Sequence, residues 1–167
     1  MNLRDATYSD WKFLLDLRND DSTKENSFDQ TNVDEEEHKH WLKQSLKNSK
    51  RRIRILCDET LSIPLGMIRE DLWDNDISNF SNITLSWAIH PNNRGKGLGT
   101  KILGLAIKDR PETFYAEIKF GNEASIKMTK NNGFIDESAK YLDPNKERLY
   151  YTYKKRGPLE IIGASYV

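Results

Sequence analysis

One run of alternating glycines constrains the fold more than any other feature of this chain. Gly95, Gly97 and Gly99 lie in a turn that follows a short apolar segment ending at Pro91. The apolar residues that come next recur at helical spacing, so the turn connects a strand to the start of a helix. The first amides of a helix have no partner within it, and the helix dipole is positive there. A turn without side chains at this position suits the binding of a pyrophosphate.

The spacing of the glycines excludes two common phosphate-binding loops. Thr100 and Ile102 stand where a G-x-G-x-x-G would require glycine, and no G-x-x-x-x-G-K-[ST] is present. The segment instead reads Arg94-Gly95-Lys96-Gly97-Leu98-Gly99. It resembles the R/Q-x-x-G-x-G/A signature of the GNAT N-acetyltransferase superfamily, in which this loop binds the pyrophosphate of acetyl-CoA.

The resemblance implies that acetyl-CoA is the cosubstrate and that this segment holds it. In that family the strand before the loop separates from its neighbour, and its exposed backbone pairs with the pantetheine arm. A backbone N–H near Ile89 is then the candidate donor that stabilises the developing oxyanion. His90 directly precedes Pro91, which favours an exposed turn histidine, with a catalytic base as the alternative. The residues of this segment that we expect to contact acetyl-CoA are Ala88, Ile89, His90, Arg94, Gly95, Lys96, Gly97, Leu98, Gly99 and Thr100.

A second segment with the same resemblance begins at Asn122. The family commonly has N-x-x-S/A, then a helix, then G-F, and this chain has Asn122, Ser125 and Gly133-Phe134. Asn122 and Ser125 are therefore expected at the cofactor, and Asn122 also fits as the N-cap of the helix. Many members carry a general-acid tyrosine seven residues after the asparagine, where this chain has Thr129. A threonine hydroxyl is too weakly acidic to replace it, which leaves water or a tyrosine from elsewhere, such as Tyr141.

The order of the segments predicts an α/β domain. Strands are expected over residues 3–6, 51–58, 64–70, 83–89, 114–119, 134–139 and 148–154, with helices that begin at Ser9, at Asp34, after Gly99 and at Asn122. Residues 20–32 are expected to be irregular. This order, β-α-α-β-β-β-α-β-α-β-β, is that of the GNAT acyl-CoA N-acyltransferase fold, which implies a mixed, mostly antiparallel sheet flanked by about four helices. We assign residues 1–156 to this domain and 157–167 to a C-terminal tail.

Charge and composition narrow the classes of partner. The 26 basic and 26 acidic residues cancel, which argues against nucleic acid as a partner. No stretch of about 18 apolar residues is present, so no membrane span is expected, and the first residues lack the apolar core of a signal peptide. Cys57 is the only cysteine, which excludes an internal disulfide and favours a buried structural thiol. We therefore expect a cytoplasmic, soluble protein without a bound metal.

A pattern near the N-terminus points to the acceptor side. Arg18-Asn19 followed by His38-x-x-Trp41 resembles an R-N…H-x-x-W pattern. That pattern recurs in GNAT branches that act on nucleotide-linked amino sugars and on ribosomal-protein N-termini, in which the two N-terminal helices wall the acceptor site. His38 and Trp41 share a helix face; alternatively, Trp41 belongs to the core and His38 is its partly exposed neighbour. The expected substrate-binding residues are Arg18, Asn19, His38 and Trp41.

The general base is less clearly marked. Many relatives carry a glutamate on the strand before the glycine loop, about where this chain has Thr84. Glu70 follows an apolar strand and could face the cleft, with a solvated turn as the alternative. The expected catalytic residues are His38, Glu70 and, through its backbone N–H, Ile89.

These resemblances together imply an acetyl-CoA-dependent N-acetyltransferase that acts on a primary amine by direct attack. The favoured acceptor is a small-molecule amine, namely an amino sugar linked to a nucleotide. The N-terminal or lysine amine of a protein, or a small polyamine, is the alternative acceptor. A non-catalytic acyl-CoA-binding module is the alternative of another class, because Thr84 and Thr129 replace the family's glutamate and tyrosine. The expected assembly is a monomer or a homodimer.

Overall fold

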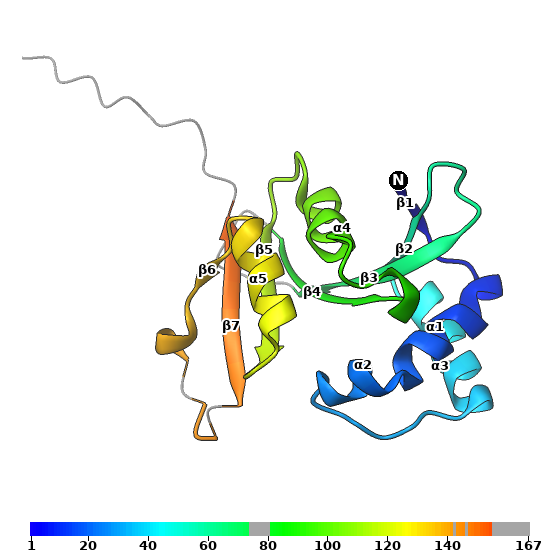
Figure 1. Cartoon of the computed structure of the whole chain (residues 1–167), viewed down its shortest axis with the longest axis horizontal. Helices are drawn as coiled ribbons and strands as arrows, with labels where there is room; N and C mark the ends of the chain where they lie inside the picture. Colours follow the sequence, from blue (N-terminus) through cyan, green and yellow to red (C-terminus); the bar gives the residue numbers. More distant parts are fainter. Residues whose placement is uncertain (74–80, 142, 146, 155–167) are drawn as a thin grey trace, which may run out of the picture.

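The computed structural model describes residues 1–73, 81–141, 143–145 and 147–154. At its centre is a seven-stranded sheet with the strand order β1-β2-β3-β4-β5-β7-β6 (Figure 1). Neighbouring strands are antiparallel except for the parallel pair β4 and β5. The mixed, mostly antiparallel sheet that the sequence predicts is therefore confirmed. The strands are β1 (Asn2–Asp5), β2 (Arg51–Cys57), β3 (Pro64–Trp73), β4 (Asn82–Ile89), β5 (Thr113–Lys119), β6 (Ile135–Asp136) and β7 (Arg148–Lys154).

Helices cover both faces of the sheet. In Figure 1, α1 and α3 lie on one side of β2 and β3, and α4 lies on the other side. No described helix is long and apolar enough to cross a membrane. The helices are α1 (Trp11–Asn19), α2 (Asp21–Glu25), α3 (Glu35–Lys47), α4 (Leu98–Ile107) and α5 (Glu123–Asn131), with short 3₁₀ turns at Tyr8–Asp10, Pro91–Asn93 and Ser138–Lys140.

Three elements differ from the expectation. Helix α2 forms within the segment expected to be irregular, because the Asp20 side chain accepts a hydrogen bond from the Thr23 N–H and caps it. Strand β3 continues to Trp73, which pairs with Asn82, and β6 keeps only two of its six expected residues. Residues 74–80, which lie between the strands expected over 64–70 and 83–89, and the expected tail over 157–167 lie outside the described residues.

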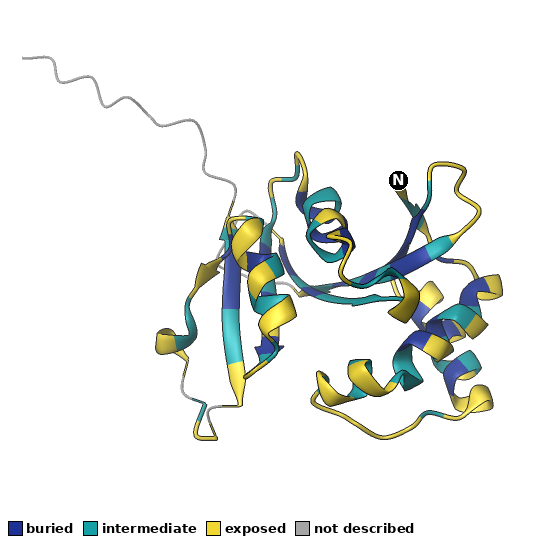
Figure 2. Ribbon diagram, in the orientation of Figure 1, coloured by how far each residue is buried: buried dark blue, intermediate teal, exposed yellow. Residues whose placement is uncertain are grey.

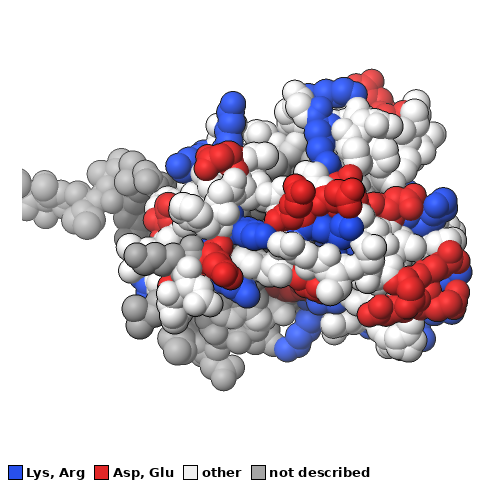
Figure 3. Space-filling model, turned by 60° about the horizontal axis from the view of Figure 1, so that its bottom comes forward, with Lys and Arg blue, Asp and Glu red and all other residues white. Residues whose placement is uncertain are grey.

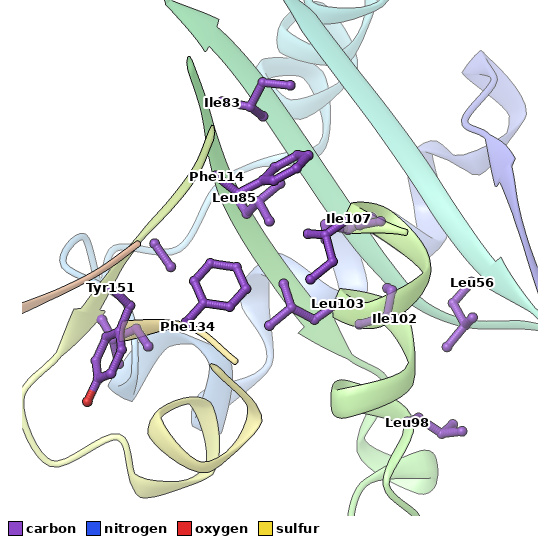
Figure 4. Packing of buried hydrophobic residues seen from close by; sticks show 14 of the residues in the cluster. Leu56, Ile83, Leu85, Leu98, Ile102, Leu103, Ile107, Phe114, Phe134 and Tyr151 are labelled. Carbon is purple, nitrogen blue, oxygen red and sulfur yellow. The ribbon is translucent and has the colours of Figure 1, made fainter. Parts of the chain in front are cut away.

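The apolar core lies on both faces of the sheet. The larger cluster packs α4 against the sheet, with Ile102 and Leu103 fully buried between them (Figure 4). The smaller cluster lies beneath α1 and α3 and contains Cys57, which is buried as the sequence predicts. Since consecutive strand residues face opposite sides of a sheet, Ile53, Ile55 and Cys57 of β2 join the smaller cluster, whereas Leu56 of the same strand joins the larger one.

The parallel pair β4 and β5 separates soon after it begins. The two strands are paired from Asn82 with Thr113 to Thr84 with Tyr115, and the described register ends there. Among the described strands, the second half of β4 beyond Thr84 has a partner on its β3 side alone. The fold thus contains an open wedge, in which one edge of β4 is not paired with any described strand.

Candidate functional site

Three cavities meet at the open wedge. Their volumes are about 330, 450 and 510 Å³. The smallest lies between the separated strands, the second lies against α1 and α3, and the largest follows the glycine loop and the start of α4 and α5. Ser27 and Trp87 line all three. The cavities are therefore parts of one continuous cleft.

The largest cavity collects most of the residues expected at the cofactor. It is lined by Ala88 and Ile89 of β4, by the loop and first turn of α4, and by the first turn of α5. Of the expected residues, those on its wall are Ala88, Ile89, Arg94, Gly95, Gly97, Leu98, Gly99, Thr100, Asn122 and Ser125. We refer to it as the loop cavity.

The glycines have distinct structural roles in the loop. Gly95 and Gly97 have φ angles of +74° and +73°, which few other residues adopt. Gly97 is also the N-cap of α4 and carries no side chain to occupy the first amides of the helix. A Cβ at Gly99 would lie 2.3 Å from the Met128 sulfur, so this glycine allows α4 and α5 to approach. The loop therefore presents bare helix-end amides to the cavity.

Two residues expected at the cofactor point elsewhere. The Lys96 ammonium folds back onto its own loop, where it donates to the Asn92 carbonyl at 2.8 Å. The His90 ring stacks on Phe13 of α1 at a centroid distance of 6.1 Å. Neither residue is on the wall of any of the three cavities. Sequence position alone could not reveal this, because Lys96 turns back onto its own loop and His90 packs against a residue far away in the sequence.

The backbone of Ile89 faces the open edge of β4. The His90 N–H donates to the Leu65 carbonyl of β3 at 2.9 Å. Consecutive residues of an antiparallel strand direct their N–H groups to opposite edges, so the Ile89 N–H points into the wedge. The Ile89 carbonyl accepts a hydrogen bond from Arg94 Nε at 3.1 Å. The structure thus presents an N–H donor where the sequence analysis expects one.

The start of α5 forms the opposite wall of the loop cavity. Asn122 caps this helix, since its Oδ1 accepts the Ser125 N–H at 3.1 Å, and both residues line the cavity. Thr129 is fully buried, and its hydroxyl lies within hydrogen-bond distance of the Ile126 and Ser125 carbonyls of its own helix. Tyr141 stacks on Tyr150, and neither lines any of the three cavities. No tyrosine of the described chain borders the cleft.

The second cavity contains three of the four residues expected at the acceptor. Arg18, His38 and Trp41 line it, and we call it the acceptor cavity. His38 is only 3% exposed, and its ring lies 5.2 Å from that of Trp41. Among the described residues its Nε2 has no hydrogen-bond partner. Burial lowers the pKa of His38 below 6.5, a hydrogen bond to the Trp11 carbonyl opposes the shift, and nearby Arg18 adds to it.

Arg18 and Asn19 contribute to this cavity in different ways. Arg18 Nη2 pairs with Asp29 at 3.1 Å, whereas its buried Nη1 has no partner within the described residues. Asn19 is not on the wall; its side chain bonds both the N–H and the carbonyl of Val33, at 2.9 and 2.8 Å. Asn19 therefore fixes the segment that closes the cavity. On the face shown in Figure 3, acidic and basic side chains lie next to one another over much of the surface, and a group of acidic side chains gathers at the right of the view.

Glu70 is placed outside the cleft, which corrects the expectation. Strand alternation puts Arg69 on the cleft side and Glu70 on the α4 side of β3. The Glu70 carboxylate is buried there between the guanidinium groups of Arg54 and Arg110. An acid held by two cations away from the cavities has no path to a substrate in them, so its role is structural.

Sequence reasoning missed several residues of the cleft. Arg69, Ser86 and Trp87 line the acceptor cavity from β3 and β4. Strand alternation could have placed Arg69 and Ser86 on one face, since they are register partners. Residues 26–29 also line the cleft, and no pattern in that polar segment marks them.

Comparisons with known proteins agree with this geometry. A family model described as an acetyltransferase (GNAT) domain matches residues 1–135. Spermidine N-acetyltransferase from Vibrio cholerae, solved with CoA and spermine, superposes with a TM-score of 0.77 at 15% identity, over 92% of this chain and 94% of that one.

Two further solved structures have the same fold. An aminoglycoside acetyltransferase solved with coenzyme A gives a TM-score of 0.74 at 16% identity, covering 92% of this chain and 94% of that one. A ribosomal-protein-alanine N-acetyltransferase from Brucella melitensis gives 0.71 at 22% identity, covering 92% and 99%. A sequence comparison with curated proteins finds no match.

Proposed function

The chain belongs to the GNAT acetyltransferase family, and from this premise we propose that it transfers the acetyl group of acetyl-CoA directly to a primary amine. The observation that carries the proposal is the meeting of the loop cavity and the acceptor cavity at Trp87 and Ala88. A thioester held in one cavity and an amine held in the other come together at the end of β4. No covalent attachment to the protein is needed for such a transfer.

The loop cavity fits the cofactor on structural grounds. Gly97 leaves the α4 amides bare, and a helix start of this kind binds a diphosphate. The separated β4 edge offers backbone groups to the amides of a pantetheine arm. Acetyl-CoA, when bound, supplies an activated thioester. The Ile89 N–H would donate to the carbonyl oxygen of that thioester and stabilise the negative charge that develops there.

His38 is our proposed base or acceptor ligand. It lines the acceptor cavity with an unpaired Nε2, and its lowered pKa keeps the ring neutral at pH 7. A neutral imidazole can accept a proton from an attacking amine. The Trp41 ring contacts this imidazole, with 5.2 Å between the ring centres. Glu70, held by its two arginines, takes no part in the proposal.

We propose an amino sugar, linked to a nucleotide, as the acceptor. A buried guanidinium nitrogen of Arg18 without a partner among the described residues favours an acceptor that brings oxygen atoms or negative charge. The same guanidinium disfavours a polycation such as spermine, which the Vibrio enzyme was solved with. Asp29 and Glu37 lie toward the rim, where they would attract an amine.

A panel of amines tests this proposal. Purified protein would be mixed with acetyl-CoA and UDP-glucosamine, glucosamine, spermidine or a peptide with a free N-terminus, and the release of free thiol would be followed. We expect the fastest turnover with UDP-glucosamine. Faster turnover with the peptide would overturn the amino-sugar proposal in favour of a protein acceptor. Faster turnover with spermidine would overturn it in favour of a polyamine. Acetyl-CoA binding without turnover on any amine would favour the non-catalytic module.

Replacing Thr129 by valine should leave turnover unchanged within about twofold, because its hydroxyl is bonded within α5 and Thr129 is not on the wall of any of the three cavities. The loss of one buried hydrogen bond should lower the free energy of unfolding by about 1 kcal/mol. Steady-state rates and chemical unfolding check the two statements. Thr152→Val, another buried threonine off the cavity walls, is the matched control. A fall of turnover with Thr129→Val alone would make Thr129 the missing acid.

A further inference from the structure

A short segment covers the cleft where its three cavities join. We call residues 20–28 the strap; it contains α2, the cap Asp20 and the residues up to Phe28. Members of the strap line all three cavities, and Ser27 lines each of them. No residue of α2 is buried (Figure 2). The strap is therefore held by polar contacts more than by the apolar core.

One end of the strap is attached to the glycine loop by Arg94. Its Nη2 donates to Asp20 Oδ2 at 2.5 Å and to Thr23 Oγ1 at 3.1 Å, across a gap of more than seventy residues in sequence. Its Nε holds the Ile89 carbonyl. Burial tends to raise the pKa of Asp20, but the bonds from Arg94 and Thr23 outweigh it and lower that pKa. Asp20 is thus a charged partner at neutral pH.

The other end is attached across the wedge. Lys119 Nζ at the end of β5 donates to the Glu25 carbonyl at 2.8 Å. The guanidinium of Arg148 in β7 lies 4.0 Å from the centre of the Phe28 ring. The strap therefore spans the separation between β4 and the β5–β7 pair (Figure 1).

We propose that Arg94 is a positioning residue that latches the strap, through Asp20, onto the end of β4. This rests on the proposed function, since the latch joins Ile89, the proposed oxyanion donor, to the strap that lines the acceptor cavity. One guanidinium fixes both the Ile89 carbonyl and the cap of α2. In this proposal the backbone amides of the glycine loop bind the diphosphate of acetyl-CoA, and the side chain of Arg94 does not.

The latch depends on the charge-assisted hydrogen bond from Arg94 to Asp20. Arg94 and Asp20 have side chains that are 34% and 18% exposed, so water weakens the pair less than at a fully open surface. A segment without buried apolar contacts opens locally at a small fraction of the cost of global unfolding. Removing one charge-assisted bond should therefore raise the population of the open strap about five- to tenfold.

Asp20→Asn isolates the latch. Asparagine caps a helix as well as aspartate does, so α2 keeps its cap and loses only the charge that binds Arg94. We expect amide hydrogen exchange over residues 21–28 to become about five- to tenfold faster. KM for the best amine of the panel should rise by a similar factor, and the dissociation constant of acetyl-CoA should stay within about twofold. Arg94→Gln should reproduce the faster exchange and the raised KM, and the double variant should add nothing further to either.

Asp34→Asn is the matched control, because Asp34 caps α3 in the same way and has no arginine partner in the described chain. It should change neither exchange over 21–28 nor KM. If Arg94→Gln weakens acetyl-CoA binding tenfold while Asp20→Asn leaves exchange and KM unaltered, Arg94 binds the cofactor directly and the latch proposal is wrong. The exchange measurement needs no substrate. A wild-type protein that fails to bind acetyl-CoA would overturn the proposed function while exchange still reports on the latch.

Discussion

Acetyl-CoA should bind the Gly97→Asn variant about ten- to a hundredfold more weakly than the wild-type protein. Gly97 has a φ of +73° and open space around its Cα, so asparagine, which tolerates this conformation, fits without distorting the chain. Its side chain would cap the first amides of α4 and occupy the place of the diphosphate. Losing one or two charge-assisted hydrogen bonds accounts for the expected factor. Titration calorimetry measures it.

Gly133→Asn is the control for the backbone conformation. Gly133 also has a positive φ, of +78°, and lies after α5, off the cavity walls. Its asparagine variant should bind acetyl-CoA like the wild type. At a hundredfold excess over the dissociation constant, acetyl-CoA should stabilise the wild type and this control by about 2.7 kcal/mol. Unchanged affinity in Gly97→Asn would mean that the loop serves the fold alone.

The sequence predicted the sheet well because its signals are local and strong. The apolar residues of 83–89, the glycine turn and the helical spacing of Ile102, Leu103 and Ala106 each determine one element, and the structure has them in that order. Helix α2 was missed because it buries no residue and therefore has no apolar face to detect. Its formation depends on the Asp20 cap, which in turn binds an arginine far away in sequence.

The candidate site was predictable where backbone geometry decides it. Gly97 and Asn122 line the loop cavity because a strand–turn–helix and a helix cap place them there. Glu70 was misplaced because a shift of one residue along a strand reverses the face on which a side chain lies, and no sequence pattern indicated its partners Arg54 and Arg110. Side-chain direction in turns was equally beyond sequence reasoning, as Lys96 illustrates.

His38→Gln should lower kcat/KM for the best acceptor by about a hundredfold. Glutamine preserves much of the side-chain volume in the acceptor cavity but cannot take up a proton. Acetyl-CoA affinity should stay within about twofold, because the loop cavity does not include this residue. His40→Gln is the matched control, since His40 is exposed on the same helix. Calorimetry and steady-state kinetics on both variants make the comparison.

The pH profile separates a base from a structural histidine. Burial lowers the pKa of His38 below 6.5, so the ring is neutral and active as a base above that lowered pKa. Wild-type kcat/KM should therefore fall as the pH drops through it, beyond the fall that protonation of the amine substrate sets, and the His38→Gln profile should keep only the fall set by the substrate. The free energy of unfolding should also fall as the pH drops below 6.5, because His38 binds a proton more readily in the unfolded chain than in the folded one. A low rate in the variant with a pH profile identical to that of the wild type would assign His38 to packing, since loss of the base would have changed the profile.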